Sequence, residues 1–203
     1  MTNDIYLWIT TNWAELLGTI LGLIYIFLSV KQNIWTWPVG LACSVLYIYV
    51  YFHAKFYADM ALQFYYVGVS IYGWYFWLKG NKQNKKKELA VSRCTDKQWL
   101  LLLLSAMALC LFIFFILNDY TDSPVPLGDA ITTALSLVAT WMLARKLVEH
   151  WTLWIFIDAY STYLYVQKDL MPTALLFIVY TIMAIVGFVQ WKKEITQATS
   201  NGE

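Results

Sequence analysis

Charged side chains are scarce in this chain. Asp, Glu, Lys and Arg make up 13% of its 203 residues, while hydrophobic residues make up 60%. Soluble domains average about 25% charged and 45–50% apolar residues. A soluble domain or a basic nucleic-acid-binding protein is therefore excluded. The composition indicates an integral membrane protein that lies in a lipid bilayer.

Recognisable enzyme motifs are missing as well. The sequence has no H-E-x-x-H, G-x-S-x-G, Walker A or G-x-G-x-x-G pattern and no cluster of metal ligands. We therefore expect no enzymatic activity, no cofactor, no metal site and no direct use of ATP by this chain. The cysteines Cys43, Cys94 and Cys110 lack C-x-x-C spacing. The first residues carry no Lys or Arg, so we predict no cleavable signal peptide.

Seven apolar segments approach the length that a membrane span requires, about 20 helical residues for a core of about 30 Å. They cover residues 13–30, 36–52, 56–78, 99–117, 127–143, 150–166 and 171–191. We predict an all-α, polytopic fold with seven transmembrane helices. The one long linker is a basic loop at residues 79–97.

The basic residues are distributed unevenly over the predicted loops. If the loop 79–97 is cytoplasmic, all 14 Lys and Arg residues except Lys55 and Lys168 lie on the inner side. Because inner loops of membrane proteins are enriched in Lys and Arg, this places the N-terminus outside and the C-terminus in the cytoplasm.

The chain contains an internal repeat at an offset of 114 residues. Matching pairs include Lys31/Arg145, Trp37/Trp151, Tyr66/Tyr180, Gly73/Gly187 and Trp77/Trp191. We predict two three-helix repeats at 13–78 and 127–191, joined by a linker helix at 98–118. Because the linker helix inverts the second copy, the two repeats should be parallel in a 3+1+3 arrangement. Parallel repeats are a transporter architecture, with the substrate site near the membrane midplane between them.

The stretch W-T-L-W-I-F-I-D places a carboxylate at membrane depth. Trp151, Trp154 and Asp158 are spaced i, i+3 and i+7, so they share one face of a helix. A carboxylate left in lipid costs at least about 2.5–3.5 kcal/mol, which makes Asp158 a candidate functional residue. Aromatic faces beside a carboxylate suit a flat organic cation.

Two further predicted helices carry candidate site residues. Gln63 and Tyr66 belong to a polar and aromatic stripe, and Tyr180 is the repeat equivalent of Tyr66. We expect Gln63, Tyr66, Trp151, Trp154, Asp158 and Tyr180 to line one cavity. Asp158 or Gln63 could instead bond a neighbouring helix as structural glue.

Residues near the ends of the predicted helices call for simpler interpretations. We expect Trp8, Trp13, Trp35, Trp99 and Trp191 to belong to the aromatic belts at the membrane surfaces. We expect His53 and His150 to contact water.

Three stretches resemble the PnuC family of vitamin transporters. They are W-P-V-G at 37–40, F-Y-A-D-M-A-L-Q-F-Y-Y at 56–66 and I-Y-G-W-Y-F-W at 71–77. In the second repeat, Ala144–Asp158 resembles the family's W-x-x-W motif. The resemblance runs from about Glu15 to Lys193.

The resemblance implies a fold related to the SWEET sugar transporters, often as a homotrimer in the bacterial inner membrane. It implies uncoupled facilitated diffusion of a vitamin or vitamin precursor, which a cytoplasmic kinase then phosphorylates and traps. It also assigns substrate-site roles to the six candidate residues.

Members of this family carry nicotinamide riboside or thiamine, and both are flat cations. Leu62–Gln63 resembles the riboside transporters, which favours nicotinamide riboside. The riboside transporters can have Asn where this chain has Asp158, and that difference favours thiamine. A membrane scaffold or receptor that transports nothing is the alternative from another class.

Overall fold

The computed structural model describes residues 13–54, 57–80, 89–167 and 171–200, and these residues form seven helices. The helices are α2 (Trp13–Val30), α3 (Thr36–Ala54), α4 (Tyr57–Lys79), α5 (Asp96–Tyr120), α6 (Pro126–Ala144), α7 (His150–Gln167) and α8 (Met171–Ser200). Each helix coincides with a predicted segment, so the all-α prediction is confirmed. The last helix continues beyond its predicted end at Trp191. Trp8 and residues 81–88 of the basic loop lie outside the described residues.

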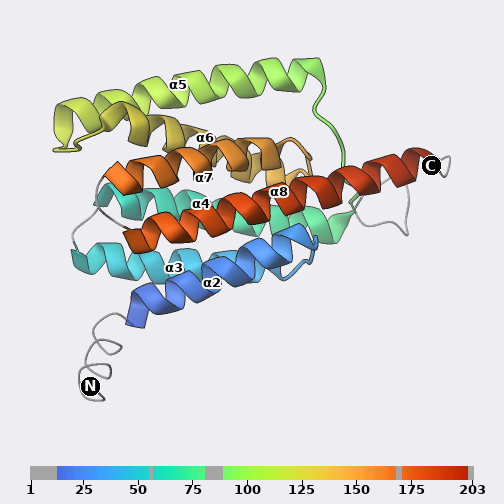
Figure 1. Cartoon of the computed structure of the whole chain (residues 1–203), viewed down its shortest axis with the longest axis horizontal. Helices are drawn as coiled ribbons and strands as arrows, with labels where there is room; N and C mark the ends of the chain where they lie inside the picture. The colour runs from blue at the N-terminus through green and yellow to red at the C-terminus, as the bar shows by residue number, and fades with distance from the viewer. Residues whose placement is uncertain (1–12, 55–56, 81–88, 168–170, 201–203) are drawn as a thin grey trace.

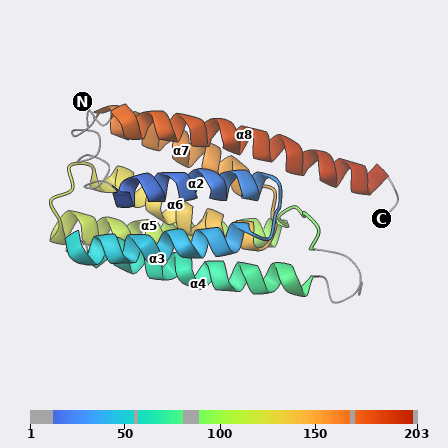
Figure 2. The ribbon, with the colours of Figure 1, turned by 90° about the horizontal axis from the view of Figure 1, so that it is seen from below.

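The helices form one bundle and run along a common direction (Figure 1). Helix α5 lies along one side of the bundle (Figure 1), and the C-terminal end of α8 projects past its neighbours (Figure 2). Among the described residues, 96–120, 126–144 and 171–197 have the length and hydropathy of a membrane span. The other helices carry more polar and aromatic side chains, as expected for helices that face one another.

Helix α5 is built to face lipid. Thr95 caps its first turn, and Gln98 completes the capping box. Its leucines are largely exposed, with Leu101 at 66% and Leu111 at 60% of their full accessible surface. In a bilayer this apolar surface would contact acyl chains, while α5 packs on α6 along its other side.

The tertiary contacts follow the same order in two groups of three helices. The neighbouring helices α2, α3 and α4 pack in sequence, as α6, α7 and α8 do. Between these groups, α2 packs on α8 and α4 packs on α6. At the offset of 114 residues, α6 is the equivalent of α2, and α8 is the equivalent of α4. The contact between α2 and α8 is therefore the equivalent of the contact between α6 and α4. The two groups are therefore related by a pseudo-two-fold axis.

Two tryptophans make equivalent hydrogen bonds across this axis. Trp77 Nε1 donates to the Ala144 carbonyl at 3.2 Å, and Trp191 Nε1 donates to the Val30 carbonyl at 3.1 Å. Both pairs of partners are repeat equivalents. Trp191 has no exposed surface, so its predicted place in an aromatic belt is wrong. Its indole is instead buried against the opposite repeat.

A chain of four buried tryptophans crosses the axis. The ring centroids are 5.3 Å apart for Trp37 and Trp77, 6.5 Å for Trp77 and Trp191, and 5.7 Å for Trp191 and Trp151. The two outer pairs are edge-to-face, the arrangement that aromatic quadrupoles favour. This cluster forms the core at the end of the bundle where α2 and α6 end.

Two equivalent glycines make room for the outer tryptophans. A Cβ on Gly73 would lie 2.4 Å from the ring of Trp37, and a Cβ on Gly187 would lie 2.6 Å from the ring of Trp151. A side chain at either position would displace the indole packed against it. The glycine in each I-Y-G or I-V-G stretch is therefore a packing requirement of its repeat.

The segment before α5 docks on the turn between α6 and α7. Ser92 forms an isolated parallel β-bridge with Leu147. The Ser92 amide donates to the Lys146 carbonyl, and the Val148 amide donates to the Ser92 carbonyl, both at 3.0 Å. The Cys94 amide also donates to Glu149 Oε2 at 3.1 Å. This described end of the predicted basic loop is thus held against the start of α7.

Candidate functional site

A cavity of about 150 Å³ lies between α2, the end of α6, α7 and α8. Four of the six predicted site residues line it: Trp151, Trp154, Asp158 and Tyr180. Its other lining residues are Gly22, Tyr25, Ile26, Ser29, Leu143 and His150. An engineered protein cavity of about 150 Å³ binds benzene, so this space accommodates one aromatic ring.

Asp158 supplies the carboxylate of the cavity. It lies in the middle of α7 and is 2% exposed. Its backbone carbonyl accepts a hydrogen bond from Thr162, while its side chain contributes to the cavity wall. A carboxylate held away from water is unfavourable unless a cation or hydrogen-bond donors offset the lost hydration. A cationic ring in the cavity would provide that compensation.

Aromatic side chains form much of the remaining wall. Trp154 is half-buried, whereas Trp151 is 1% exposed and packs into the tryptophan cluster. Tyr180 reaches the cavity from α8 because α2 has a glycine opposite it. A Cβ on Gly22 would lie 2.4 Å from the Tyr180 hydroxyl oxygen. Gly22 therefore determines how far the hydroxyl extends toward α2.

His150 lies at the end of the cavity next to the α6–α7 turn. It has no exposed surface, so the prediction that it contacts water is wrong. Its ring packs between Trp151 and Trp191, with centroid separations of 4.4 and 4.8 Å. Its Nδ1 lies 2.7 Å from the Leu147 carbonyl oxygen. The docked segment before α5 is bonded to the same turn.

The remaining two predicted site residues lie outside this cavity. Gln63 and Tyr66 are half-buried on α4, and Tyr66 lies against Ser136 of α6. Ser136 is the repeat equivalent of Gly22, so Tyr66 meets a serine in its contact, whereas Tyr180 meets a glycine in the equivalent contact. In this conformation the structure does not bring Gln63 and Tyr66 together with the other four.

The cavity is chemically asymmetric across the pseudo-two-fold axis. The first-repeat equivalents of Trp154 and Asp158 are Gly40 and Ser44. The two tryptophans and the negative charge thus belong to the second repeat, while the first repeat contributes Tyr25. Sequence reasoning missed Gly22, Tyr25 and His150 as lining residues. The repeat could have indicated that His150 is a lining residue, because a threonine, Thr36, stands at the equivalent position of the first repeat.

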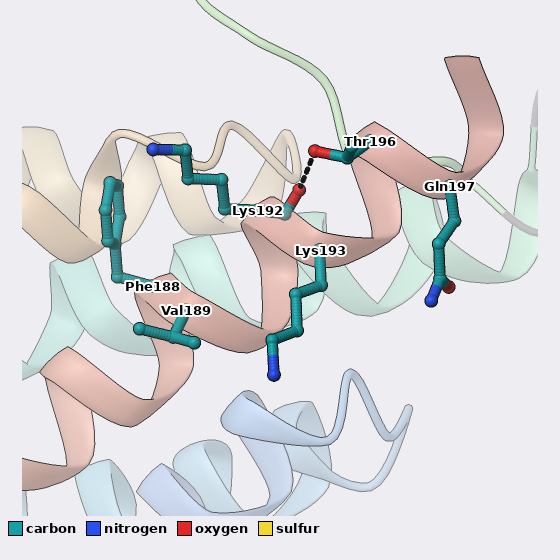
Figure 3. Close-up of a pocket in the computed structure, with 6 residues that line it drawn as sticks. All are labelled: Phe188, Val189, Lys192, Lys193, Thr196 and Gln197. Atoms are coloured by element: carbon teal, nitrogen blue, oxygen red, sulfur yellow. Dashed lines mark hydrogen bonds between the residues drawn. The ribbon is translucent and has the colours of Figure 1, made fainter. Parts of the chain in front are cut away.

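A second hollow, of about 450 Å³, lies on the C-terminal part of α8 (Figure 3). The described residues that line it all come from this one helix: Phe188, Val189, Lys192, Lys193, Thr196 and Gln197. Thr196 donates to the Lys192 carbonyl within the helix. Among the described residues only one helix borders this hollow, whereas four helices surround the smaller cavity, so the smaller cavity is the better candidate. Among the described residues, no group of three or more His, Cys, Asp or Glu side chains could hold a metal ion.

Known proteins similar to this chain are transporters. The family model for the nicotinamide mononucleotide transporter matches residues 12–193. A nicotinamide riboside transporter PnuC from Escherichia coli is 28% identical, and the alignment covers 89% of this chain and 85% of the relative. The riboflavin/roseoflavin transporter RibM from Streptomyces davaonensis is 25% identical, over 88% of this chain and 84% of the relative.

The fold also matches a solved structure. A crystal structure of the vitamin B3 transporter PnuC superposes with a TM-score of 0.74 and 23% identity, over 96% of this chain and 87% of that chain. The predicted resemblance to the PnuC family is therefore confirmed, and the prediction that the protein is not an enzyme agrees with its relatives. The chain belongs to the nicotinamide mononucleotide transporter family, as a multi-pass transport protein of the bacterial inner membrane.

Proposed function

We propose that this protein carries nicotinamide riboside, a flat cationic vitamin precursor, into the cell. The observation that carries the proposal is the placement of Asp158, Trp154 and Tyr180 around one ring-sized cavity. A pyridinium ring there would contact aromatic faces, each worth about 0.5–2 kcal/mol to a cation, and would lie near a carboxylate. Relatives named as nicotinamide riboside transporters support the same substrate.

The size of the cavity bears on the transport mechanism. At about 150 Å³ it holds one ring but not a complete nucleoside. The ribose must extend along a path that opens when helices of the two repeats separate. Gln63 and Tyr66 would contact the substrate in such a state, with Gln63 bonding a polar edge of the ligand.

The proposed transport is uncoupled facilitated diffusion. A cytoplasmic kinase would phosphorylate the riboside, and the added negative charge would prevent its return. The proposed assembly is a homotrimer with a helix arrangement like that of the SWEET transporters. Each chain would have repeats at 13–78 and 127–191, an outside N-terminus and a cytoplasmic C-terminus. A fluorescent-protein fusion at the C-terminus and native mass spectrometry would test orientation and assembly.

Proteoliposomes provide the direct test of this function. Labelled nicotinamide riboside should equilibrate across the membrane without any ion gradient, and internal unlabelled riboside should accelerate its entry. Empty liposomes are the control. Accumulation above the external concentration under an imposed proton gradient would contradict the uncoupled mechanism. If no riboside enters, the proposed substrate is wrong.

Two alternative substrates belong in the same assay. RibM shows that the curated relatives include a flavin transporter, and riboflavin is flat but carries no positive charge. Thiamine is a flat cation whose aminopyrimidine could bond Asp158. A membrane scaffold would carry none of the three, and Trp154→Ala would then lower its stability without changing any binding.

A further inference from the structure

His150 presents a buried nitrogen that the fold leaves without a partner. Its Nε2 lies in a side chain with no exposed surface and has no hydrogen-bond partner among the described residues. His150 is among the residues that line the cavity, together with Trp151 and Trp154. Buried polar atoms in proteins are nearly always hydrogen-bonded, so an orphaned one calls for an explanation.

The hydrogen bond at the other nitrogen determines what Nε2 can do. A carbonyl oxygen can only accept, so Nδ1 carries the proton that it shares with Leu147 at 2.7 Å. A charged imidazolium without exposed surface would be strongly unfavourable, so the ring is neutral. Nε2 is then a lone-pair acceptor. Because Nδ1 is turned toward the α6–α7 turn, Nε2 lies on the side of the ring away from that turn.

The equivalent position in the first repeat shows that the fold itself does not require this acceptor. Thr36 replaces His150 there and is equally buried. Its hydroxyl lies 3.3 Å from the Ser29 hydroxyl, so its polar group is satisfied within the protein. A small hydroxyl residue could occupy position 150 of the second repeat in the same way. It instead has an imidazole whose Nε2 has no partner among the described residues, in a residue that lines the cavity.

We propose that His150 is a substrate-binding residue whose Nε2 accepts a hydrogen bond from an N–H or O–H group of the transported molecule. Eight residues separate His150 from Asp158 on α7, which is about 12 Å along the helix. A cation near Asp158 and a donor group near Nε2 would together fix the direction of the ligand in the cavity. This inference rests on the proposed transport of nicotinamide riboside.

The test observes the imidazole directly in the full-length protein. The chain contains two histidines, so His53→Gln leaves His150 as the sole source of signal in protein with ¹⁵N-labelled histidine. Adding nicotinamide riboside should move the Nε2 resonance toward a hydrogen-bonded position, while the Nδ1 resonance stays in place. Titration with nicotinamide separates the two donors. A shift with both compounds assigns the carboxamide, and a shift with the riboside alone assigns a ribose hydroxyl.

Two substitutions supply an independent measurement. His150→Asn keeps a polar nitrogen near the Nδ1 position and removes the Nε2 position, while His150→Gln places a polar atom near Nε2. His150→Asn should weaken riboside binding about tenfold, and His150→Gln should weaken it less. An unchanged Nε2 resonance in protein that binds the riboside would overturn the proposal, as would wild-type affinity in His150→Asn. If the wild-type protein does not bind the riboside, the proposed function itself fails.

Discussion

Lys146 Nζ donates a hydrogen bond to Gln32 Oε1 at 3.1 Å, and the two residues are separated by 114 positions, the offset of the internal repeat. Repeat equivalents that touch each other must lie beside the pseudo-two-fold axis. Both have a left-handed backbone, with φ of 53° at Gln32 and 52° at Lys146, and both follow the end of an equivalent helix.

The hydrogen bonds around these two residues show the same helix ending. The Asn33 amide donates to the Leu28 carbonyl, and the Leu147 amide donates to the Met142 carbonyl. This is the six-to-one bond of a Schellman motif in each repeat. The repeat therefore provides a matched control position for most changes near the cavity.

The glycines opposite the tryptophans provide one such pair. Gly187→Ala and Gly73→Ala should each destabilise the protein by about 1–3 kcal/mol, because each methyl group would overlap an indole. Only Gly187→Ala moves Trp151, which lines the cavity, so only this variant should also weaken riboside binding. Thermal unfolding and calorimetric titration in detergent would measure the two effects. Gly68→Ala, with no atom within 4 Å of the added Cβ, is the neutral control. Equal losses of binding at 73 and 187 would contradict this assignment.

The two tryptophans of the W-x-x-W motif should respond differently to truncation. Trp151 is fully packed in the core, so Trp151→Ala should cost about 3–5 kcal/mol of stability. Trp154 is half-buried at the cavity, so Trp154→Ala should weaken binding about 3- to 30-fold with a smaller loss of stability. Comparing unfolding midpoints with dissociation constants separates the roles. Trp154→Phe should retain part of the affinity because it preserves an aromatic face.

The charge of Asp158 predicts a selective effect. Asp158→Asn should weaken nicotinamide riboside binding about tenfold or more, because a charge-assisted contact is lost. The reduced dihydronicotinamide riboside has nearly the same shape without the positive charge, and its binding should change much less. Competition of both compounds against labelled riboside would measure the difference. An equal loss of binding affinity for the two ligands would mean that Asp158 has a structural role and does not bind the charge of the substrate.

Cys94 predicts a pH-dependent reactivity outside the membrane-spanning helices. Burial, together with the neighbouring Glu149 carboxylate, raises the pKa of the Cys94 thiol to about 12. The thiolate is the reactive form, so alkylation at pH 8 should be at least about a hundredfold slower than in the unfolded chain. The rate should rise about tenfold per pH unit up to the raised pKa.

Glu149→Gln tests the cause of this shift. The substitution removes the negative charge and leaves an oxygen that can still accept from the Cys94 amide. The pKa of Cys94 should therefore fall and its alkylation at pH 8 should accelerate. Peptide mass spectrometry distinguishes Cys94 from Cys43 and Cys110. An unchanged rate in Glu149→Gln would show that burial alone protects the thiol.

Several features of the fold follow directly from the sequence. The apolar segments predicted all seven described helices, because a lipid environment requires about 20 consecutive apolar residues for each span. The offset of 114 residues paired Trp37 with Trp151 and Gly73 with Gly187, and in the structure each tryptophan packs on the glycine of its own repeat. The i, i+3, i+7 spacing also brought Trp154 and Asp158 into the same cavity wall.

Helical periodicity shows which residues share a face, but it does not show which neighbouring helix that face contacts. The sequence by itself determined the seven helices, the repeat and the aromatic and acidic face of α7. Tertiary structure alone decided that this face meets α2 and α8, so that Gly22 and Tyr25 join the cavity while Gln63 and Tyr66 lie outside it. It also decided that His150, near the end of a predicted span, is buried. The physical reason is that packing across the pseudo-two-fold axis joins residues 67 and 161 positions apart, and no local pattern encodes those contacts.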